Sequence, residues 1–173
     1  LSGEGTELDK TVMEKIGDPL VHLVRNSIDH GIEMPQKRIA AGKSAFGTLS
    51  LDATQAGGNI CITLTNDRGG LDKDRILAKA RSRGLVGANK VLTDEQICEL
   101  IFMPGFSTAE QTTDVSGRGV GMDVVRRNVA ELGGSIEVRT EKGAGSRFII
   151  TLPLTLAIVD GQSVGVGKET YIV

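Results

Sequence analysis

Two β-hairpins separated by helices constrain the fold of this chain more than any other feature of its sequence. Apolar and polar residues alternate over 47–55 and 59–65 around a Gly-Gly turn, and again over 135–140 and 146–152. Alternation of period two beside a glycine turn is typical of antiparallel strands with one buried face. Because no strand–helix–strand alternation occurs, the order of elements predicts an α+β two-layer sandwich, a mostly antiparallel sheet with helices on one face.

Capping residues mark the helices that would cover this sheet. Asp18-Pro19 can open a helix that ends at Gly31, and Asp72 and the Thr93-Asp94-Glu95-Gln96 capping box can open two more. Residues 104–118 lack periodicity, and long structureless segments in compact domains are usually lids or binding loops. We expect a strand over 3–8 and helices over 9–16, 19–30, 35–42, 72–84, 93–103 and 119–132.

The helix over 19–30 carries polar side chains beside its buried edge. His22, Asn26 and either Asp29 or His30 are three or four residues apart and share a face. Polar groups next to a core need partners, so we expect this face to bind an ionic ligand with its cation. The neighbouring apolar stripe, which would dock on the core, consists of Leu20, Leu23, Val24 and Ile28.

Three glycines at alternate positions join the long loop to the last helix, in the sequence Ser116-Gly117-Arg118-Gly119-Val120-Gly121-Met122-Asp123. Glycine lets the backbone approach a ligand and point several N–H groups at one place. The helix N-terminus adds partial positive charge and Arg118 adds a full one, so the segment suits a phosphate group. It is neither a Walker A loop nor a dinucleotide-binding turn. A flexible glycine loop is the alternative.

The composition excludes several classes of protein. With 173 residues, a formal net charge of −2 and no basic run, the chain gives no indication of nucleic-acid binding. No segment approaches the roughly 18 apolar residues of a membrane span, so we expect a cytoplasmic protein without membrane insertion. Cys61 and Cys98 are expected to be free thiols. The chain starts without Met and ends on an apolar run, as an excised fragment would.

The polar helix and the glycine loop, in this order, resemble the Bergerat-type ATP-binding fold shared by histidine kinases, type II topoisomerases, Hsp90 chaperones and mismatch-repair ATPases. Within this group the sequence resembles most the catalytic domains of chemotaxis histidine kinases. This resemblance implies a protein histidine kinase that transfers the γ-phosphoryl group of ATP to a histidine, with ATP and Mg²⁺ as cofactors. The segments that carry it are 22–33, 104–108, 114–125 and 152–158.

The resemblance assigns roles by position. Asn26 would bind the Mg²⁺ that bridges the triphosphate, in agreement with the oxygen preference of this cation. His22 stands where topoisomerases and Hsp90 relatives carry a Glu. An imidazole there suits transfer to a histidine better than hydrolysis, because it can accept or relay the acceptor's proton. Arg25 and His30 would contact phosphates, and Asp29 would orient His30. The alternative role for His30 is that of a histidine at a helix C-terminus, stabilised there by the helix dipole.

Other segments complete the expected nucleotide site. Residues 104–115 would form a lid over ATP, with Phe106 as its core anchor. Lys79 is a candidate phosphate contact, with a solvated lysine as the alternative. His22 is the predicted catalytic residue and Asn26 the predicted metal ligand. The predicted nucleotide-binding residues are Arg25, Asn26, Asp29, His30, Asn66, Gly70, Lys79, Ser107, Thr108, Ser116, Gly117, Arg118, Gly119, Val120, Gly121, Met122 and Ser146.

The segment after the first hairpin departs from the family pattern Asp-x-Gly-x-Gly, whose Asp accepts a hydrogen bond from the adenine amino group. Here it reads Asn66-Asp67-Arg68-Gly69-Gly70. Asn66 keeps an acceptor oxygen without a charge, and Arg68 puts a large cation in place of the first glycine. Asp67 is a poor substitute, because a one-residue slip turns a strand's side chains to the opposite face. We expect weakened or altered nucleotide affinity.

A linker-like run, Leu152-Pro153-Leu154-Thr155-Leu156, divides the chain into a catalytic ATP-binding domain over 1–155 and the first strands of an SH3-like regulatory domain over 156–173. The resemblance implies a histidine phosphotransfer domain outside this fragment and response regulators downstream. It also implies a CheW-like adaptor and chemoreceptors, bound through the regulatory domain. The fragment is expected to be monomeric and the full-length protein dimeric. Two other interpretations stay open: a degenerate nucleotide-binding scaffold, favoured by Arg68, and an ATP-gated clamp, disfavoured by His22.

Overall fold

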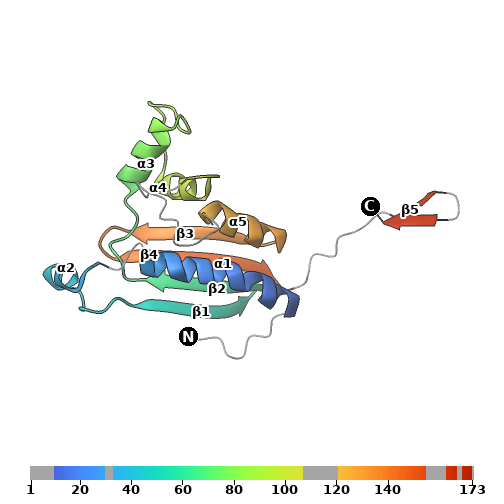
Figure 1. Ribbon diagram of the computed structural model, residues 1–173, viewed down its shortest axis with the longest axis horizontal. Coiled ribbons are helices and arrows are strands. Elements are labelled where there is room, and N and C mark those ends of the chain that lie inside the picture. Colours follow the sequence, from blue (N-terminus) through green and yellow to red (C-terminus); the bar gives the residue numbers. More distant parts are fainter. Residues whose placement is uncertain (1–9, 30–32, 107–120, 155–162, 167–168, 173) are drawn as a thin grey trace.

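Four strands form one antiparallel sheet, so both predicted hairpins are confirmed (Figure 1). The strand order is β1-β2-β4-β3, which joins the hairpins through the central pair β2 and β4. The strands are β1 over Leu49–Ala56, β2 over Asn59–Asn66, β3 over Ser135–Glu141 and β4 over Gly145–Pro153. The computed structural model describes residues 10–29, 33–106, 121–154, 163–166 and 169–172.

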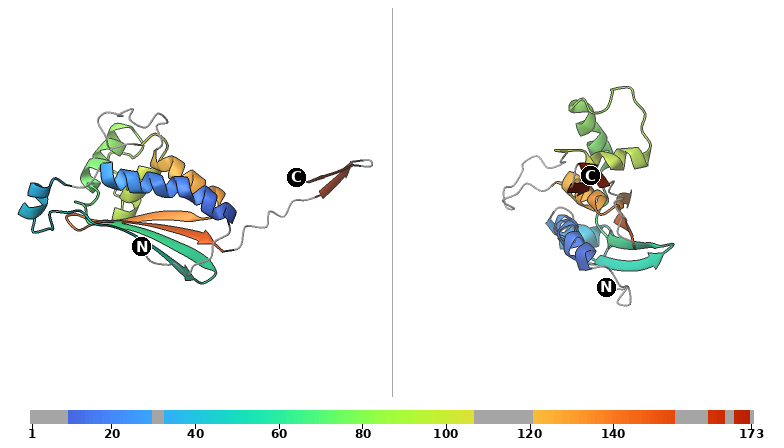
Figure 2. Two further views of the ribbon diagram at one scale, coloured as in Figure 1. Left: turned by 60° about the horizontal axis from the view of Figure 1, so that its bottom comes forward. Right: turned by 90° about the vertical axis from the view of Figure 1, so that its right-hand side faces the viewer.

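Helices cover one face of this sheet, as predicted for a two-layer α+β fold (Figure 2). In the first two figures α1 and α5 lie side by side over the sheet. Leu23 of α1, Ile76 of α3 and Val129 of α5 are each at most 1% exposed and form part of the core between the layers. The helices are α1 over Lys10–Asp29, α2 over Pro35–Ala40, α3 over Lys73–Ser82, α4 over Asp94–Glu99, a 3₁₀ turn over Leu100–Phe102 and α5 over Met122–Glu131.

Alternation along β2 and β4 points one row of side chains toward the helices. Ile62 and Leu64 of β2 are buried, and Leu64 pairs with the buried Phe148 of β4. This row ends at Asn66, which is only 4% exposed and pairs with the buried Ser146. The inward row is therefore apolar along the sheet and polar at one end, where two polar side chains lie beneath the helices.

Helix α1 runs unbroken through Pro19, so the prediction of two helices with Asp18 as an N-cap was wrong. Proline lacks the N–H donor of one helical hydrogen bond, but its fixed φ is compatible with a helix. Val12, Ile16, Pro19 and Leu23 follow one another at helical spacing, and all four are buried. Burial of this continuous apolar stripe outweighs the loss of one hydrogen bond.

The apolar stripe of α1 also differs from the prediction at its C-terminal end. Leu23 is buried, and Leu20 and Val24 are partly buried, but Ile28 is 53% exposed. The residue that turns inward is Ser27, at 1% exposure. Because Ser27 follows Leu23 by four residues, α1 points a hydroxyl at the sheet where an isoleucine was expected.

Local signals set the other helices close to their predicted places. Asp72 caps α3 by accepting a hydrogen bond from the backbone N–H of Arg75 at 3.0 Å. Thr93 and Gln96 form the predicted capping box of α4. Helix α5 begins at Met122, later than expected. Short-range capping chemistry was therefore sufficient to place these helices.

Several expectations concern other parts of the chain. The strand expected over 3–8 and residues 107–118 of the long loop lie outside the described residues. β5 over Ser163–Val166 and β6 over Glu169–Ile172 pair with each other in a second sheet, and the domain division at 155 stays a prediction. Both cysteines are free. Among the described helices, none has the length and apolarity needed to cross a membrane.

Candidate functional site

The two predicted halves of the phosphate site meet where α1 and α5 lie side by side. Asn26 Nδ2 donates a hydrogen bond to Met122 Sδ at 3.4 Å, across 96 positions of sequence. Met122 is the first residue of α5, and the N-cap Gly121 makes no side-chain capping hydrogen bond. The N-terminus of α5 therefore lies beside Asn26, and such a terminus favours an anion. We call His22, Asn26 and Met122 the α1–α5 junction.

His22 lies one helical turn before Asn26, and its Nε2 is buried with no hydrogen-bond partner in the described part of the chain. Burial lowers the pKa of this imidazole, Arg25 lowers it further, and Asp123 opposes the shift. The imidazole is therefore neutral at pH 7, with a ring nitrogen available for proton exchange. A pocket of about 340 Å³ opens beside it between the two helices, lined also by Asn128 of α5.

Asn26 is the residue of this junction that suits a hard divalent cation. The side-chain nitrogen of Asn26 donates to the sulfur of Met122, which leaves the side-chain oxygen of Asn26 for a ligand. The described residues contain no group of three His, Cys, Asp or Glu side chains that could hold a metal ion. The junction therefore fits Mg²⁺ that arrives with a nucleotide, because Mg²⁺ can take one protein oxygen and complete its shell with phosphate oxygens and water.

A second group of polar contacts surrounds residues 66–70, which we call the β2 loop. Asn66 Oδ1 accepts hydrogen bonds from the backbone N–H groups of Ser146 at 3.2 Å and Arg68 at 3.4 Å. Asn66 Nδ2 donates to Ser27 Oγ at 3.4 Å. The structure thus brings the predicted residues Asn66 and Ser146 together and adds Ser27. The only sequence signal for Ser27 was its helical spacing from Leu23.

Arg68 reaches from the β2 loop back to α1, where its Nη1 donates to the backbone carbonyl of Asn26 at 3.3 Å. Burial lowers the pKa of this guanidinium, and the charge of Glu33 opposes the shift. Arginine stays protonated in proteins. A permanent positive charge therefore lies between the β2 loop and the polar helix, next to the residues predicted to bind the base.

A network of charges holds the β2 loop in place, and the sequence analysis did not find it. Arg38 of α2 is only 1% exposed and donates to both carboxylate oxygens of Asp67, at 2.8 and 3.3 Å, and to Glu33 Oε2 at 3.1 Å. Lys43 Nζ donates to Glu33 Oε1 and to the backbone carbonyls of Asp67 and Arg68. In sequence these residues look like ordinary surface charges.

The pKa shifts in this network follow from its ion pairs. Burial alone would raise the pKa of Asp67, but the backbone N–H of Thr48 and the Arg38 guanidinium hold it below its ordinary value. The hydrogen bond from Arg38 to Asp67 in turn raises the pKa of Arg38. Both carboxylate oxygens of Asp67 are therefore used by Arg38 and Thr48. This agrees with the expectation that Asp67, the residue after Asn66, points to the opposite side.

Two glycines lock the β2 loop against the turn between β3 and β4. Gly70 has a φ of +80°, and a Cβ there would lie 2.4 Å from the carbonyl oxygen of Glu141. Gly145 has a φ of +135°, and a Cβ there would lie 2.0 Å from the carbonyl oxygen of Asn66. Both positions therefore require glycine. For Gly70 this structural role is sufficient to explain the glycine, and its contact with a nucleotide stays a prediction.

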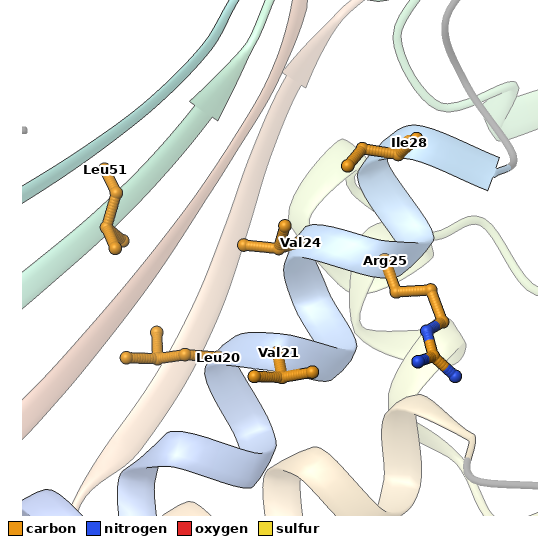
Figure 3. Close-up of a pocket in the computed structure, with 6 residues that line it drawn as sticks. All are labelled: Leu20, Val21, Val24, Arg25, Ile28 and Leu51. Carbon is orange, nitrogen blue, oxygen red and sulfur yellow. The ribbon is translucent and has the colours of Figure 1, made fainter.

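A groove of about 500 Å³ lies away from these contacts, between α1 and β1 (Figure 3). Leu20 and Val24 point from α1 toward Leu51 of β1, whereas the side chain of Arg25 points away from the strand. Because the lining is mostly apolar, this groove is not the predicted phosphate site. Arg25 lies on the exposed side of α1, where its charge acts on His22.

Some of the remaining predicted residues lie in the described part of the chain and others lie outside it. Phe106 is 6% exposed beneath the guanidinium of Arg83, at 5.9 Å from the ring centre, so its expected burial in the core is confirmed, and its role as the anchor of a lid stays a prediction. Lys79 is partly buried in the last turn of α3. The side chain of Asp29 lies outside the described part of the chain, as do His30, Ser107, Thr108, Ser116, Gly117, Arg118, Gly119 and Val120.

Fold and contacts together define an α+β module in which a polar helix faces the N-terminus of another helix, as in the ATP-binding domains of histidine kinases. Residues 16–156 match the family described as Histidine kinase-, DNA gyrase B-, and HSP90-like ATPase, and the chain belongs to this family. Membership confirms the predicted class of ATP-binding module.

Individual relatives agree with this assignment. The chain is 59% identical over 172 residues to the chemotaxis protein CheA of Salmonella typhimurium, and 49% identical over 173 residues to CheA of Bacillus subtilis. Each match covers 99% of this chain and 26% of the relative, so the chain spans about a quarter of these proteins. Over that quarter it corresponds to their ATP-binding catalytic module.

A solved structure shows the same fold. The histidine kinase ThkA, determined in complex with the response regulator protein TrrA, superposes with a TM-score of 0.53 at 18% identity. The superposition covers 91% of this chain and 34% of that chain. At this level of identity the similarity concerns the arrangement of helices and strands, and it confirms the predicted two-layer α+β architecture.

Proposed function

We propose that this chain binds Mg-ATP and supplies its γ-phosphoryl group to a histidine on a separate phosphotransfer domain. The observation that carries this proposal is the α1–α5 junction. It combines a carboxamide oxygen for a cation, a helix N-terminus for phosphates, and a buried imidazole nitrogen that has no partner in the described part of the chain. The high identity to chemotaxis kinases over the same residues supports it.

In this reaction the phosphoryl group passes directly from ATP to the acceptor histidine, without a covalent intermediate on this chain. The neutral imidazole of the acceptor histidine attacks the γ-phosphorus, a P–N bond forms, and the bond to the β-phosphate oxygen breaks to release ADP. Magnesium, when bound with the nucleotide through Asn26, would neutralise charge on the phosphates. The acceptor ring loses a proton as it becomes phosphohistidine, and the neutral His22 can accept or relay that proton. Phosphoryl transfer depends chiefly on such positioning and charge stabilisation.

The partners follow from the relatives and belong to this proposal. Chemotaxis kinases of this kind suggest response regulators downstream and a CheW-like adaptor with chemoreceptors bound through the regulatory domain. The solved complex of ThkA with the regulator TrrA supports the first of these. We propose a cytoplasmic location and a dimeric full-length protein, with the fragment itself monomeric.

A second candidate function is nucleotide binding without efficient turnover. The observation that favours it is Arg68, whose side chain lies against the carbonyl of Asn26 at the place where a glycine would leave room. In that case the module would retain the family fold as a scaffold. The α1–α5 junction would then bind phosphates without leading to transfer.

Incubating the chain with labelled ATP, Mg²⁺ and an isolated phosphotransfer domain tests both candidates. We expect labelled phosphohistidine on the acceptor domain. His22→Gln should lower the transfer rate about 10²- to 10⁴-fold while ATP binding stays close to that of the unchanged chain, because glutamine cannot exchange the proton. Binding of ATP without transfer by the unchanged chain would support the scaffold. Release of free phosphate without any acceptor would contradict a kinase and indicate an ATP-gated clamp.

A further inference from the structure

The pocket beside His22 continues the α1–α5 junction in one direction. The two helices meet where Asn26 contacts Met122. All the α1 residues that line the pocket come before Asn26 in the sequence, and all its α5 residues come after Met122. The pocket therefore lies next to the groups expected to hold the phosphates, on the side of His22. Its volume of about 340 Å³ is in the range of sites for small ligands.

The lining of this pocket has a buried floor and an open rim. Pro19 and Val125 are each less than 2% exposed and give the floor an apolar surface. At the rim Val21 is 59% exposed and Asp18 is exposed. Asn128 lines the pocket from α5 and is partly buried. A flat ring of modest polarity suits this site better than a phosphate, because the apolar floor offers a phosphate no hydrogen-bond donor.

His22 brings a polar atom to this pocket. Its Nε2 is buried and has no hydrogen-bond partner in the described part of the chain. In a neutral imidazole one ring nitrogen is an acceptor, and when that nitrogen is Nε2 its missing partner is a donor. The neutral imidazole of another histidine carries one N–H donor and one nitrogen lone pair. A second imidazole in the pocket could therefore complete the contact of His22 and keep its own lone pair free.

We propose that this pocket receives the side chain of the histidine that is phosphorylated. The inference rests on the proposed function, since it places the acceptor beside the α1–α5 junction. Pro19 and Val125 pack against the acceptor ring, and its N–H donates to Nε2 of His22. The second ring nitrogen, which carries the lone pair, points away from His22 and is free to attack. Asn128 is then a specificity-determining residue, because its side chain sets the width of the pocket on the side of α5.

This placement gives each participant in the transfer step a defined destination. The lone pair of the free ring nitrogen forms the P–N bond, and the electron pair of the broken P–O bond leaves with ADP. The N–H proton of the acceptor moves to Nε2 of His22, which becomes positively charged. Burial and Arg25 lower the pKa of His22, whereas the charge of Asp123 raises it, so Asp123 favours the protonated form.

Filling the pocket with a larger side chain tests the proposal. Asn128→Trp places a large ring in it from α5, and Val21→Trp does the same from the rim on α1. We expect kcat/KM for transfer to an isolated phosphotransfer domain to fall about 10²-fold or more in both, because the acceptor ring cannot reach its attacking position. Affinity for Mg-ATP should stay unchanged. Ala130→Trp, at an exposed position of α5 that does not line the pocket, is the matched control and should change neither quantity.

Free imidazole probes the pocket independently of catalysis. It is titrated at about pH 8, where it is mostly neutral, into the isotope-labelled chain with Mg²⁺ and a non-hydrolysable ATP analogue. We expect shifts in the NMR signals of His22, Val124 and Val125. The shifts should disappear in Asn128→Trp and persist in Ala130→Trp.

The outcomes separate this inference from the function on which it rests. Normal transfer by both pocket variants, or imidazole shifts that persist in Asn128→Trp, would overturn the pocket assignment and leave the kinase proposal standing. A loss of Mg-ATP affinity equal to the loss of transfer would also overturn it, because the pocket would then belong to the nucleotide. If the unchanged chain transfers no phosphoryl group, the proposed function fails, and imidazole shifts at His22 would still support a pocket for an imidazole.

Discussion

The α1–α5 junction and the β2 loop are neighbours, but they are held in opposite ways. At the junction a hydrogen bond from Asn26 to the sulfur of Met122 links the two helices, and the buried Nε2 of His22 has no partner among the described residues. In the β2 loop the side chain and carbonyl of Asp67 and the carbonyl of Arg68 accept several charged hydrogen bonds from Arg38 and Lys43.

This difference indicates which part of the site is prepared for a ligand and which part is already complete. A buried polar atom without a partner is unfavourable unless a ligand supplies the missing contact. The junction therefore has groups whose contacts a bound triphosphate would complete. In the β2 loop the carboxylate of Asp67 is already paired with Arg38 within the protein, so no ligand is needed to complete its contacts.

Removing Arg38 should have the largest effect of the changes considered, because its ion pairs hold the β2 loop in place. The effect should be on stability, whereas changes at the α1–α5 junction should affect binding. Arg38→Met leaves Asp67 partly buried without its cation and Glu33 paired with Lys43 alone, so we expect Tm to fall by on the order of 10 °C. Arg126→Met is the matched control, since the ion pair of Arg126 with Glu99 is about half exposed and contributes little. Thermal unfolding followed by circular dichroism measures both. Equal, small shifts would show that the network does not hold the loop.

Truncating Asn26 should have a smaller effect, and on binding rather than folding. Asn26→Ala removes the oxygen expected to bind Mg²⁺, so affinity for the Mg-nucleotide should fall at least 10- to 100-fold. The Tm should change little, because the hydrogen bond that the side chain donates within the described residues is a weak one, to sulfur. Titrations with and without Mg²⁺ check this, with Asn59→Ala as the control. If binding without Mg²⁺ falls equally, Asn26 does not act through the metal.

The pH dependence of stability should give the smallest difference. The lowered pKa of His22 means that the unfolded chain binds more protons than the folded one just below pH 6.5, so stability falls as pH drops through that range. His22→Gln should therefore lose less Tm between pH 7.5 and 5.5, by a few degrees at most. Asp67, whose pKa is also lowered, acts at more acidic pH, where protonation weakens its pairing with Arg38. Parallel curves for both chains would contradict the His22 assignment.

Signals contained within a few residues were enough to predict much of the fold. The capping box of Thr93 and Gln96, the cap at Asp72 and the two glycine turns act locally, and each is present as expected. The polar face of α1 was also predicted, because helical spacing alone places His22 and Asn26 together. Their meeting with Met122 followed only from the family resemblance.

Contacts that depend on distant segments could not be predicted in this way. Pro19 has a local signature of a helix start, but the buried stripe from Val12 to Leu23 overrides it. Arg38 resembles any exposed arginine until the end of β2 brings Asp67 to it. The orientation of the Asn66 amide depends on the backbone of β4, eighty positions away, and no sequence pattern encodes it.

The interlocked glycines also bear on how such a domain changes during evolution. The path of the β2 loop is set by the close approach of Gly70 to Glu141 and of Gly145 to Asn66, both through backbone atoms. Side chains at positions 66 and 68 do not take part in that approach. The path of the main chain here therefore depends on two glycines that a substitution at position 66 or 68 leaves in place.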